Sequence, residues 1–176
     1  MAGYEIRVFG DPVLRRVAEE VTDIDGEFVD TCNRMLDAMY EAPGLGLAAP
    51  QVGISSRFFV YDFGEGPDVL INPVIIESEG EWEYEEGCLS VPGLSWVIAR
   101  PKTIYIVGLD IDGNETSIEA DEIEARLYQH ELDHLDGRLL FEYLEQDEVK
   151  EAKRILRERA MSSGSGSQSA AGLQLP

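Results

Sequence analysis

Residues 121–137 read DEIEARLYQHELDHLDG, and this stretch decides how the rest of the chain must be arranged. Asp121 can cap a helix running to about Leu135, and Gly137 is a residue type that ends helices. Four positions share one face of this predicted helix: Ile123, Leu127, His130 and His134. The two histidines therefore continue an apolar stripe, and we expect them to point into the core.

The sequence His130-Glu131-Leu132-Asp133-His134 carries the strongest chemical signal. Residues four apart on a helix lie one above the other, so both imidazoles can reach one metal ion while Glu131 can reach a water molecule there. The chain has two histidines in all, and both lie in this motif. The alternative is a pair of ordinary core histidines, but burying two imidazoles beside a carboxylate is costly without a partner. The spacing favours a metal site.

A catalytic metal commonly has three protein ligands and one open position, so two imidazoles leave one ligand to be found. The candidates are a distant carboxylate and Cys88, which stands in the segment EGCLS (86–90). A single cysteine is more commonly packed than ligating, and both interpretations of Cys88 stay open. Cys32 lies on the apolar stripe of an amphipathic segment, 26–41, and is interpreted as a small buried hydrophobe.

Around the predicted central helix the chain alternates short apolar runs with turn signals. Strand candidates fall at 57–63, 69–76, 81–86, 94–99, 103–109 and 116–120. Successive strands without long intervening helices favour antiparallel sheets and an α+β fold. We expect these sheets to pack around the helix that carries HExxH, with an N-terminal helix at 26–41 and a C-terminal helix at 147–161.

Three further segments have distinctive compositions. Residues 42–53, APGLGLAAPQVG, make neither good helix nor good strand and predict a shaped loop. Alternating acids between Glu77 and Glu85 would share one solvated face of a single strand. We expect residues 1–161 to form one domain and the Ser/Gly-rich residues 162–176 to form a flexible tail.

The chain is strongly acidic, with 14 Lys and Arg against 35 Asp and Glu and a formal net charge of −21. This charge argues against DNA or general RNA binding through a basic surface. We expect no membrane partner, because no stretch approaches the roughly 20 apolar residues that cross a bilayer. The sequence lacks a recognisable signal or transit segment, so we expect a cytoplasmic protein.

Three motifs, in this order, resemble the signature motifs of the peptide deformylase family: GLGLAAPQ (44–51), EGCLS (86–90) and QHELDHLDG (129–137). The segment FGDPVLR (9–15) is similar to the family's N-terminal segment. The resemblance implies one divalent metal ion held by Cys88, His130 and His134. It further implies Fe(II) as the ion, with zinc, nickel or cobalt as alternatives, and thiolate and imidazole ligands suit both iron and zinc.

The same resemblance implies an activity, the removal of formate from N-formyl-methionyl peptides. Glu131 would move the proton of the attacking water. The side-chain amide of Gln51 and the backbone N–H of Leu89 would stabilise the developing oxyanion. Without the resemblance, Gln51 would be interpreted as a glutamine that merely closes a turn.

Substrate contacts are expected along the glycine-rich segment. It lacks bulky or charged side chains, so its backbone can pair with an extended peptide, most directly at Gly46. Leu45 and Leu127 can help to form an apolar pocket for the methionine side chain, although Leu127 is also a plain core residue. Binding of phosphate is disfavoured, because no Lys follows the glycines and Pro50 blocks a helix N-terminus.

The resemblance also implies one side-chain pair beyond the metal ligands. By the resemblance, Arg100 pairs with Asp133; the alternative is a solvated surface pair.

Four cations gather on one face of the C-terminal helix: Lys150, Lys153, Arg154 and Arg157. They predict either docking on ribosomal RNA or an ordinary solvated face. The alternatives to a deformylase are a zinc peptidase and a non-catalytic binder of N-terminal peptides.

Overall fold

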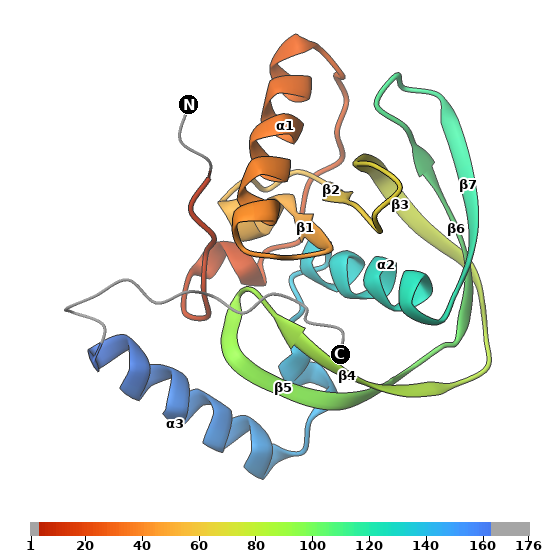
Figure 1. Cartoon of the computed structure of the whole chain (residues 1–176). Helices are drawn as coiled ribbons and strands as arrows, with labels where there is room; N and C mark the ends of the chain where they lie inside the picture. Colours follow the sequence, from red (N-terminus) through yellow and green to blue (C-terminus); the bar gives the residue numbers. More distant parts are fainter. Residues whose placement is uncertain (1–3, 163–176) are drawn as a thin grey trace.

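The computed structural model describes residues 4–162 and has the predicted α+β fold (Figure 1). The helices are α1 (Gly26–Glu41), α2 (Glu122–Leu135) and α3 (Gln146–Ser162), with single 3₁₀ turns at Pro12–Arg15, Ala49–Val52 and Leu140–Tyr143. The strands are β1 (Gly46–Ala48), β2 (Phe58–Tyr61), β3 (Asp68–Glu79), β4 (Trp82–Cys88), β5 (Val91–Arg100), β6 (Thr103–Leu109) and β7 (Glu115–Asp121). Within 4–162, each helix is too short or too polar to cross a bilayer.

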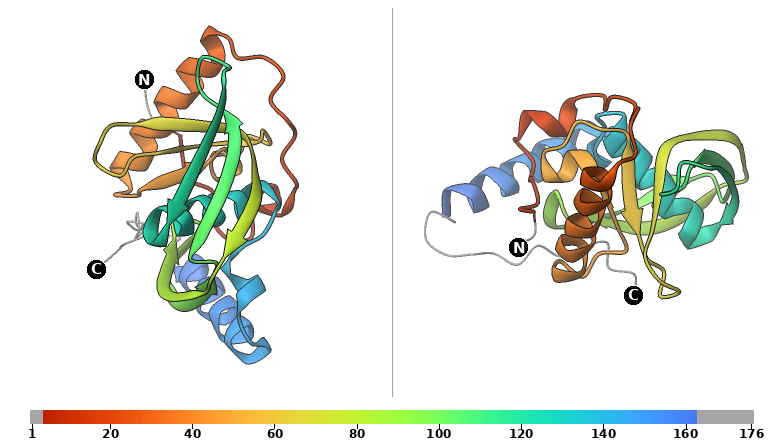
Figure 2. Two further views of the ribbon diagram at one scale, coloured as in Figure 1. Left: turned by 90° about the vertical axis from the view of Figure 1, so that its right-hand side faces the viewer. Right: turned by 90° about the horizontal axis from the view of Figure 1, so that it is seen from above.

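The strands form two antiparallel sheets around α2. One sheet has the order β1-β2-β3-β6-β7, and the other is the two-stranded β4–β5 hairpin. Figure 1 shows α2 at the centre of the molecule, between the larger sheet and the hairpin. Helices α1 and α3 lie at opposite ends, as the left view of Figure 2 also shows. The prediction of sheets packed around the HExxH helix is therefore confirmed.

Helix α1 begins and packs as its sequence predicts. The Asp25 side chain accepts a hydrogen bond from the backbone N–H of Phe28 at 2.9 Å, which caps the helix. Its buried face consists of Cys32, Met35, Ala38 and Met39. Burial raises the pKa of the Cys32 thiol to about 12, so this sulfur behaves as a small hydrophobe and not as a nucleophile.

Helix α2 is buried along most of its length, which is unusual for a helix with so many polar residues. Leu127 and Tyr128 pack in an aromatic and aliphatic cluster with Phe59, Tyr61 and Ile106. Full burial of one such side chain is worth roughly 1.5–3 kcal/mol, so this cluster holds α2 firmly against the larger sheet. The packed helix is therefore a rigid support for its polar side chains.

Both ends of α2 lie where the sequence predicts. Asp121 occupies the N-cap position, but its side chain makes no capping hydrogen bond. Gly137 follows the helix with φ of +70°, and a Cβ there would lie 2.8 Å from the backbone of Arg15. Only glycine fits this left-handed, crowded position, which ties the end of α2 to the N-terminal segment.

Two sequence expectations were wrong in part. The loop at 42–53 contains the short strand β1 and a 3₁₀ turn, because pairing with β2 satisfies the backbone groups of Gly46–Ala48. The acids between Glu77 and Glu85 are solvated as expected, but they do not share one strand. Gly80, with φ of +70°, turns the chain from β3 into β4, so the acids divide between two sheets.

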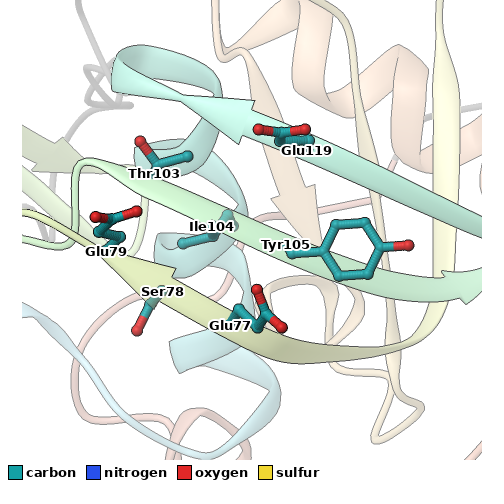
Figure 3. Close-up of a pocket in the computed structure, with 7 residues that line it drawn as sticks. All are labelled: Glu77, Ser78, Glu79, Thr103, Ile104, Tyr105 and Glu119. Atoms are coloured by element: carbon teal, nitrogen blue, oxygen red, sulfur yellow. The ribbon is translucent and has the colours of Figure 1, made fainter.

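The outward face of the larger sheet is acidic. Figure 3 shows Glu77 and Glu119 on either side of Tyr105, from the strands that flank β6. The side chain of Ile104 is buried and belongs to the core on the opposite face. Ser162 is the last residue of α3, and residues 163–176 of the expected tail lie outside the described part of the chain.

Candidate metal centre and active site

The fold brings together three buried metal-ligating side chains. Cys88 lies at the end of β4, and His130 and His134 lie one turn apart on α2. One ligand atom from each falls within 4.8 Å of the others, and Cys88 Sγ is 3.2 Å from His134 Nε2. The sequence left the third ligand open between Cys88 and a carboxylate, and the structure places the cysteine beside both rings.

The chemistry of this cluster fits a bound cation. Burial, followed by the positive charges of His130 and Arg100, holds the pKa of His134 well below its usual value, so this ring is a neutral donor. For His130 burial also opposes protonation, but its electrostatic interaction and hydrogen bond with Cys88, its hydrogen bond with Glu86 and the charge of Glu131 raise its pKa. A metal ion bound by His130 would compete with protonation of this ring. Two nitrogens and a sulfur in a buried site are typical ligands for zinc or iron.

Glu86 orients His130. One carboxylate oxygen, Oε2, lies 3.1 Å from His130 Nδ1, so a proton on Nδ1 leaves the lone pair of Nε2 for the metal. The Glu86 side chain is fully buried. Burial opposes its ionisation, yet hydrogen bonds and charge from His130 and Arg100 hold its pKa well below the usual range.

Two arginines compensate the buried charge of Glu86. Arg100 donates through Nε at 2.6 Å and Nη2 at 3.0 Å, and Arg126 Nη1 donates to Glu86 Oε1. The predicted pair of Arg100 with Asp133 is present, with 2.9 Å between Nη1 and Oδ2. Tyr143 donates to the same Asp133 oxygen at 2.7 Å. Asp133 is only slightly exposed, so this is not a solvated surface pair.

Sequence analysis missed the roles of Glu86 and Arg126. Glu86 was quoted only as part of EGCLS, and its two-residue spacing from Cys88 on a strand places both side chains on one face. Arg126 lies four residues before His130, which is the same helical spacing that identified the histidine pair. That spacing was the available signal for a partner on the histidine face of α2.

Glu131 is the second chemically distinctive carboxylate. It is 2% exposed, and its Oε2 has no hydrogen-bond partner among the described residues. Burial raises the pKa of Glu131 to about 7, although the charge of His130 and the backbone N–H of Ala48 oppose the shift. A carboxyl group with a pKa near neutrality can both accept and return a proton, which suits a general base.

Gln51 is held in one orientation. Its Oε1 accepts a hydrogen bond from Ala48 N–H at 2.9 Å, so the Nε2 donor must face the other way. That nitrogen lies 3.2 Å from Ser90 Oγ and 3.9 Å from Cys88 Sγ. Leu89 lies between Cys88 and Ser90, in the turn that connects β4 to β5. The structure thus brings Gln51 and Leu89 to the same edge of the metal cluster.

Two of the expected substrate-binding residues, Gly46 and Leu127, lie beside Glu131. A Cβ on Gly46 would be 2.8 Å from Glu131 Oε1 and 3.0 Å from Leu127 Cδ1, so a larger residue there would displace the Glu131 carboxylate. Leu127 is completely buried. Leu45 is partly buried and packs against the same cluster. Strand β1 lies at the edge of its sheet, where an extended chain can be added.

A thiol, two imidazoles and a nearby carboxylate base on an HExxH helix define a metal-dependent hydrolase. A family model described as polypeptide deformylase matches residues 4–150. The peptide deformylase of Agathobacter rectalis is 53% identical over 145 residues, covering 82% of this chain and 92% of that protein. The chain therefore belongs to the polypeptide deformylase family, whose members are metal-dependent enzymes that remove the N-formyl group from newly made peptides.

Solved structures agree with this assignment. A peptide deformylase from Legionella pneumophila superposes with a TM-score of 0.90 at 36% identity, covering 94% of this chain and 100% of that chain. A peptide deformylase from Ehrlichia chaffeensis in complex with actinonin superposes with a TM-score of 0.87 at 35% identity, covering 90% of this chain and 98% of that chain. The family resemblance of the three motifs is confirmed.

Replacing Gly46 with Ala is expected to displace the Glu131 carboxylate while leaving the fold intact. A shift of about 1 Å in a reacting group can lower kcat by about 10²-fold. Formate release from a formyl-Met peptide measures kcat, and circular dichroism checks the fold. Gly26→Ala is the control, because a Cβ there meets nothing within 4 Å. An unchanged kcat in Gly46→Ala would contradict the packing argument.

Replacing Glu86 with Gln is expected to destabilise the metal-free protein by about 3–5 kcal/mol at neutral pH, because the buried arginines lose their partner. Since folding lowers the pKa of Glu86, its charge stabilises the fold above the unfolded pKa of about 4.3. This contribution is lost as the pH falls toward the folded pKa. Urea unfolding at neutral pH and at about pH 3 should therefore show a smaller difference in acid.

The control for Glu86 is Glu142→Gln, because the pair of Glu142 with Arg15 is exposed and should contribute at most about 1 kcal/mol. A difference between Glu86→Gln and the unmodified chain that stays constant across the pH range would show that the ionised carboxylate is not the stabilising group.

Proposed function

We propose that Cys88, His130 and His134 hold the catalytic metal ion of this chain, and that Glu131 is the proton carrier of its deformylation. This proposal is carried by the Glu131 oxygen, which has no hydrogen-bond partner in the described part of the chain and lies beside three convergent candidate ligand residues. Each of these groups is buried, so charges in the site act with little screening by water. Residues 1–161 are proposed as the single catalytic domain.

The reaction adds water to the formyl carbon and divides the products into formate and a free amine. A divalent ion in the site would supply Lewis acidity, which lowers the pKa of a bound water and polarises the formyl carbonyl. Glu131 accepts the proton that the attacking water loses and returns a proton to the departing amine nitrogen. Its pKa near neutrality suits both directions of transfer.

Gln51 and Leu89 are proposed to stabilise the negative charge that develops on the formyl oxygen. Ala48 holds the Gln51 amide so that Nε2 is turned toward Cys88. The backbone N–H of Leu89, directly after Cys88, is the second donor. A donor that is already oriented needs no rearrangement as charge develops, and such donors each contribute about 10²- to 10³-fold in rate.

The substrate class is an N-formyl-methionyl peptide in extended conformation. Its backbone would pair with the edge strand β1 at Gly46, since this strand is short, glycine-containing and paired on one side with β2. The methionine side chain would lie against Leu45 and Leu127. Because the Ehrlichia chaffeensis relative was solved in complex with actinonin, we propose that this chain also binds actinonin.

Fe(II) is proposed as the resident ion, with zinc, nickel or cobalt as substitutes. A thiolate with two imidazoles suits iron and zinc alike, so ligand type does not distinguish them. Cytoplasmic location is proposed on a different ground. Both cysteines are free, and a ligating thiol needs a compartment that keeps it reduced.

Docking of α3 on ribosomal RNA is proposed as a partner interaction. Its cations are partly paired on the helix itself: Arg154 with Glu151 at 2.6 Å and Glu158 at 2.7 Å, and Lys150 with Asp147 at 3.2 Å. The side chain of Lys150 is nevertheless 74% exposed. Phosphates would have to compete with these acidic partners, so the interaction should be weak and strongly salt-dependent.

The central test is formate release from a formyl-Met peptide. We expect activity that a chelator abolishes, and a loss of at least about 10²-fold in kcat for Glu131→Gln with retained metal binding. Acetylated and free peptides are parallel substrates, and cleavage of these would indicate a zinc peptidase instead. Anaerobic loading with iron or zinc follows, and equal rates would contradict the assignment of iron. Actinonin should inhibit the active form.

Ribosome co-sedimentation across a salt series tests the role of α3. We expect binding at low salt that weakens steeply as salt rises, because counterions are released from phosphates. A variant with Lys150, Lys153, Arg154 and Arg157 changed to Gln should lose this binding and keep full activity on a free peptide. Unchanged co-sedimentation of that variant would contradict docking through this face.

A further inference from the structure

Arg126 is a buried charge that the proposed mechanism does not use. It lies on α2 one turn before His130 and is 1% exposed. Its guanidinium donates to the Glu86 carboxylate, to the carbonyl of Ile98 at 3.0 Å and to the carbonyl of Trp82. The Cζ atom also lies 5.0 Å from the ring centroid of Trp82, which covers it from one side. These partners lie in β4 and β5, so one side chain from α2 binds both strands of the hairpin.

The charge of Arg126 completes a balanced buried cluster. Glu86 and Asp133 contribute two negative charges, and Arg100 contacts both of them. Arg126 supplies the second positive charge through its contact with Glu86. Without it, two largely buried carboxylates would share a single arginine, and uncompensated buried charge is strongly unfavourable. Arg126 therefore helps to hold the Glu86 carboxylate in place beside His130 Nδ1.

The contacts of Arg126 also control the distance between the two parts of the metal site. Cys88 belongs to the β4–β5 hairpin, whereas both histidines belong to α2. A two-stranded sheet is only marginally stable by itself, so its position depends on what it binds. Arg126 donates hydrogen bonds to the backbone of both strands and to the Glu86 side chain. It therefore links the hairpin to the turn of α2 that precedes His130.

We infer that Arg126 is a positioning residue of the metal centre: it holds Glu86 and the hairpin against α2 so that Cys88 and His130 converge on one ion. This inference rests on the metal ligands given under the proposed function. Residues that orient metal ligands typically contribute about 10- to 100-fold in metal affinity. Loss of Arg126 is expected to weaken metal binding by this factor, beyond any effect on folding.

The test measures zinc binding to the full chain in the unmodified, Arg126→Leu and Arg126→Lys forms. Zinc affinity is measured by competition with a chelator, and the stability of each metal-free form is measured by urea unfolding. Arg57→Leu is the matched control, because Arg57 also binds a carboxylate and a carbonyl, at 2.8 Å from Asp136 and 3.3 Å from Pro73, but contacts none of the ligands or Glu86. Arg57→Leu should lower stability and leave zinc affinity unchanged.

Arg126→Leu should bind zinc about 10- to 100-fold more weakly than the unmodified chain. Arg126→Lys keeps the charge but cannot make all three contacts, so its affinity should fall between the two. If Arg126→Leu does not fold, the zinc affinity of Arg126→Lys serves as the test instead. Folded Arg126 variants that bind zinc as tightly as the unmodified chain would overturn the inference. Failure of the unmodified chain to bind zinc would instead overturn the ligand assignment beneath it.

Discussion

The buried carboxylate of Glu86 is the group on which the site depends. It contacts one imidazole of the metal cluster and two arginines, one from β5 and one from α2. A carboxylate with no exposure to water is tolerated only when its charge is compensated in good geometry. Here the compensating groups are also the connections between the hairpin and the central helix. The same side chains therefore compensate the charge of Glu86 and connect the hairpin to α2.

Around this cluster, the protein separates two kinds of carboxylate. Glu86 is kept ionised by its positive neighbours, whereas Glu131, one residue beyond His130, is buried with an oxygen that has no hydrogen-bond partner within residues 4–162. The pKa of Glu86 falls and the pKa of Glu131 rises, although both side chains are almost inaccessible to water. Divergent pKa values of neighbouring acids commonly separate a structural role from an acid–base role. In this molecule the first carboxylate orients His130, and the second is the one proposed to move protons.

Much of this arrangement could be predicted from the sequence where it depends on local geometry. The bounds of α1 follow from its cap and apolar spacing, and the histidine pair follows from one helical turn. The contact of Cys88 with that pair could not be predicted in this way, because it requires the β4–β5 hairpin to dock on α2, whose His134 lies 46 residues after Cys88. Gln51 was interpretable only through the family resemblance. Arg126 was overlooked because its partners are backbone carbonyls and a glutamate in distant strands.

The separation of Cys88 from His134 along the chain also determines the order in which the parts of the site are synthesised. Cys88 is synthesised well before His134, so the growing polypeptide carries a thiol whose ring partners do not yet exist. With Cys88, His130 and His134 as the proposed ligands, an ion would meet its full ligand set only once the hairpin and the helix have docked, which would couple metal loading to the completion of folding. Until then the sulfur has neither metal nor burial to shield it from oxidation. Under the proposed ligand assignment, Cys88 would have to stay reduced from its synthesis until the hairpin and α2 have docked.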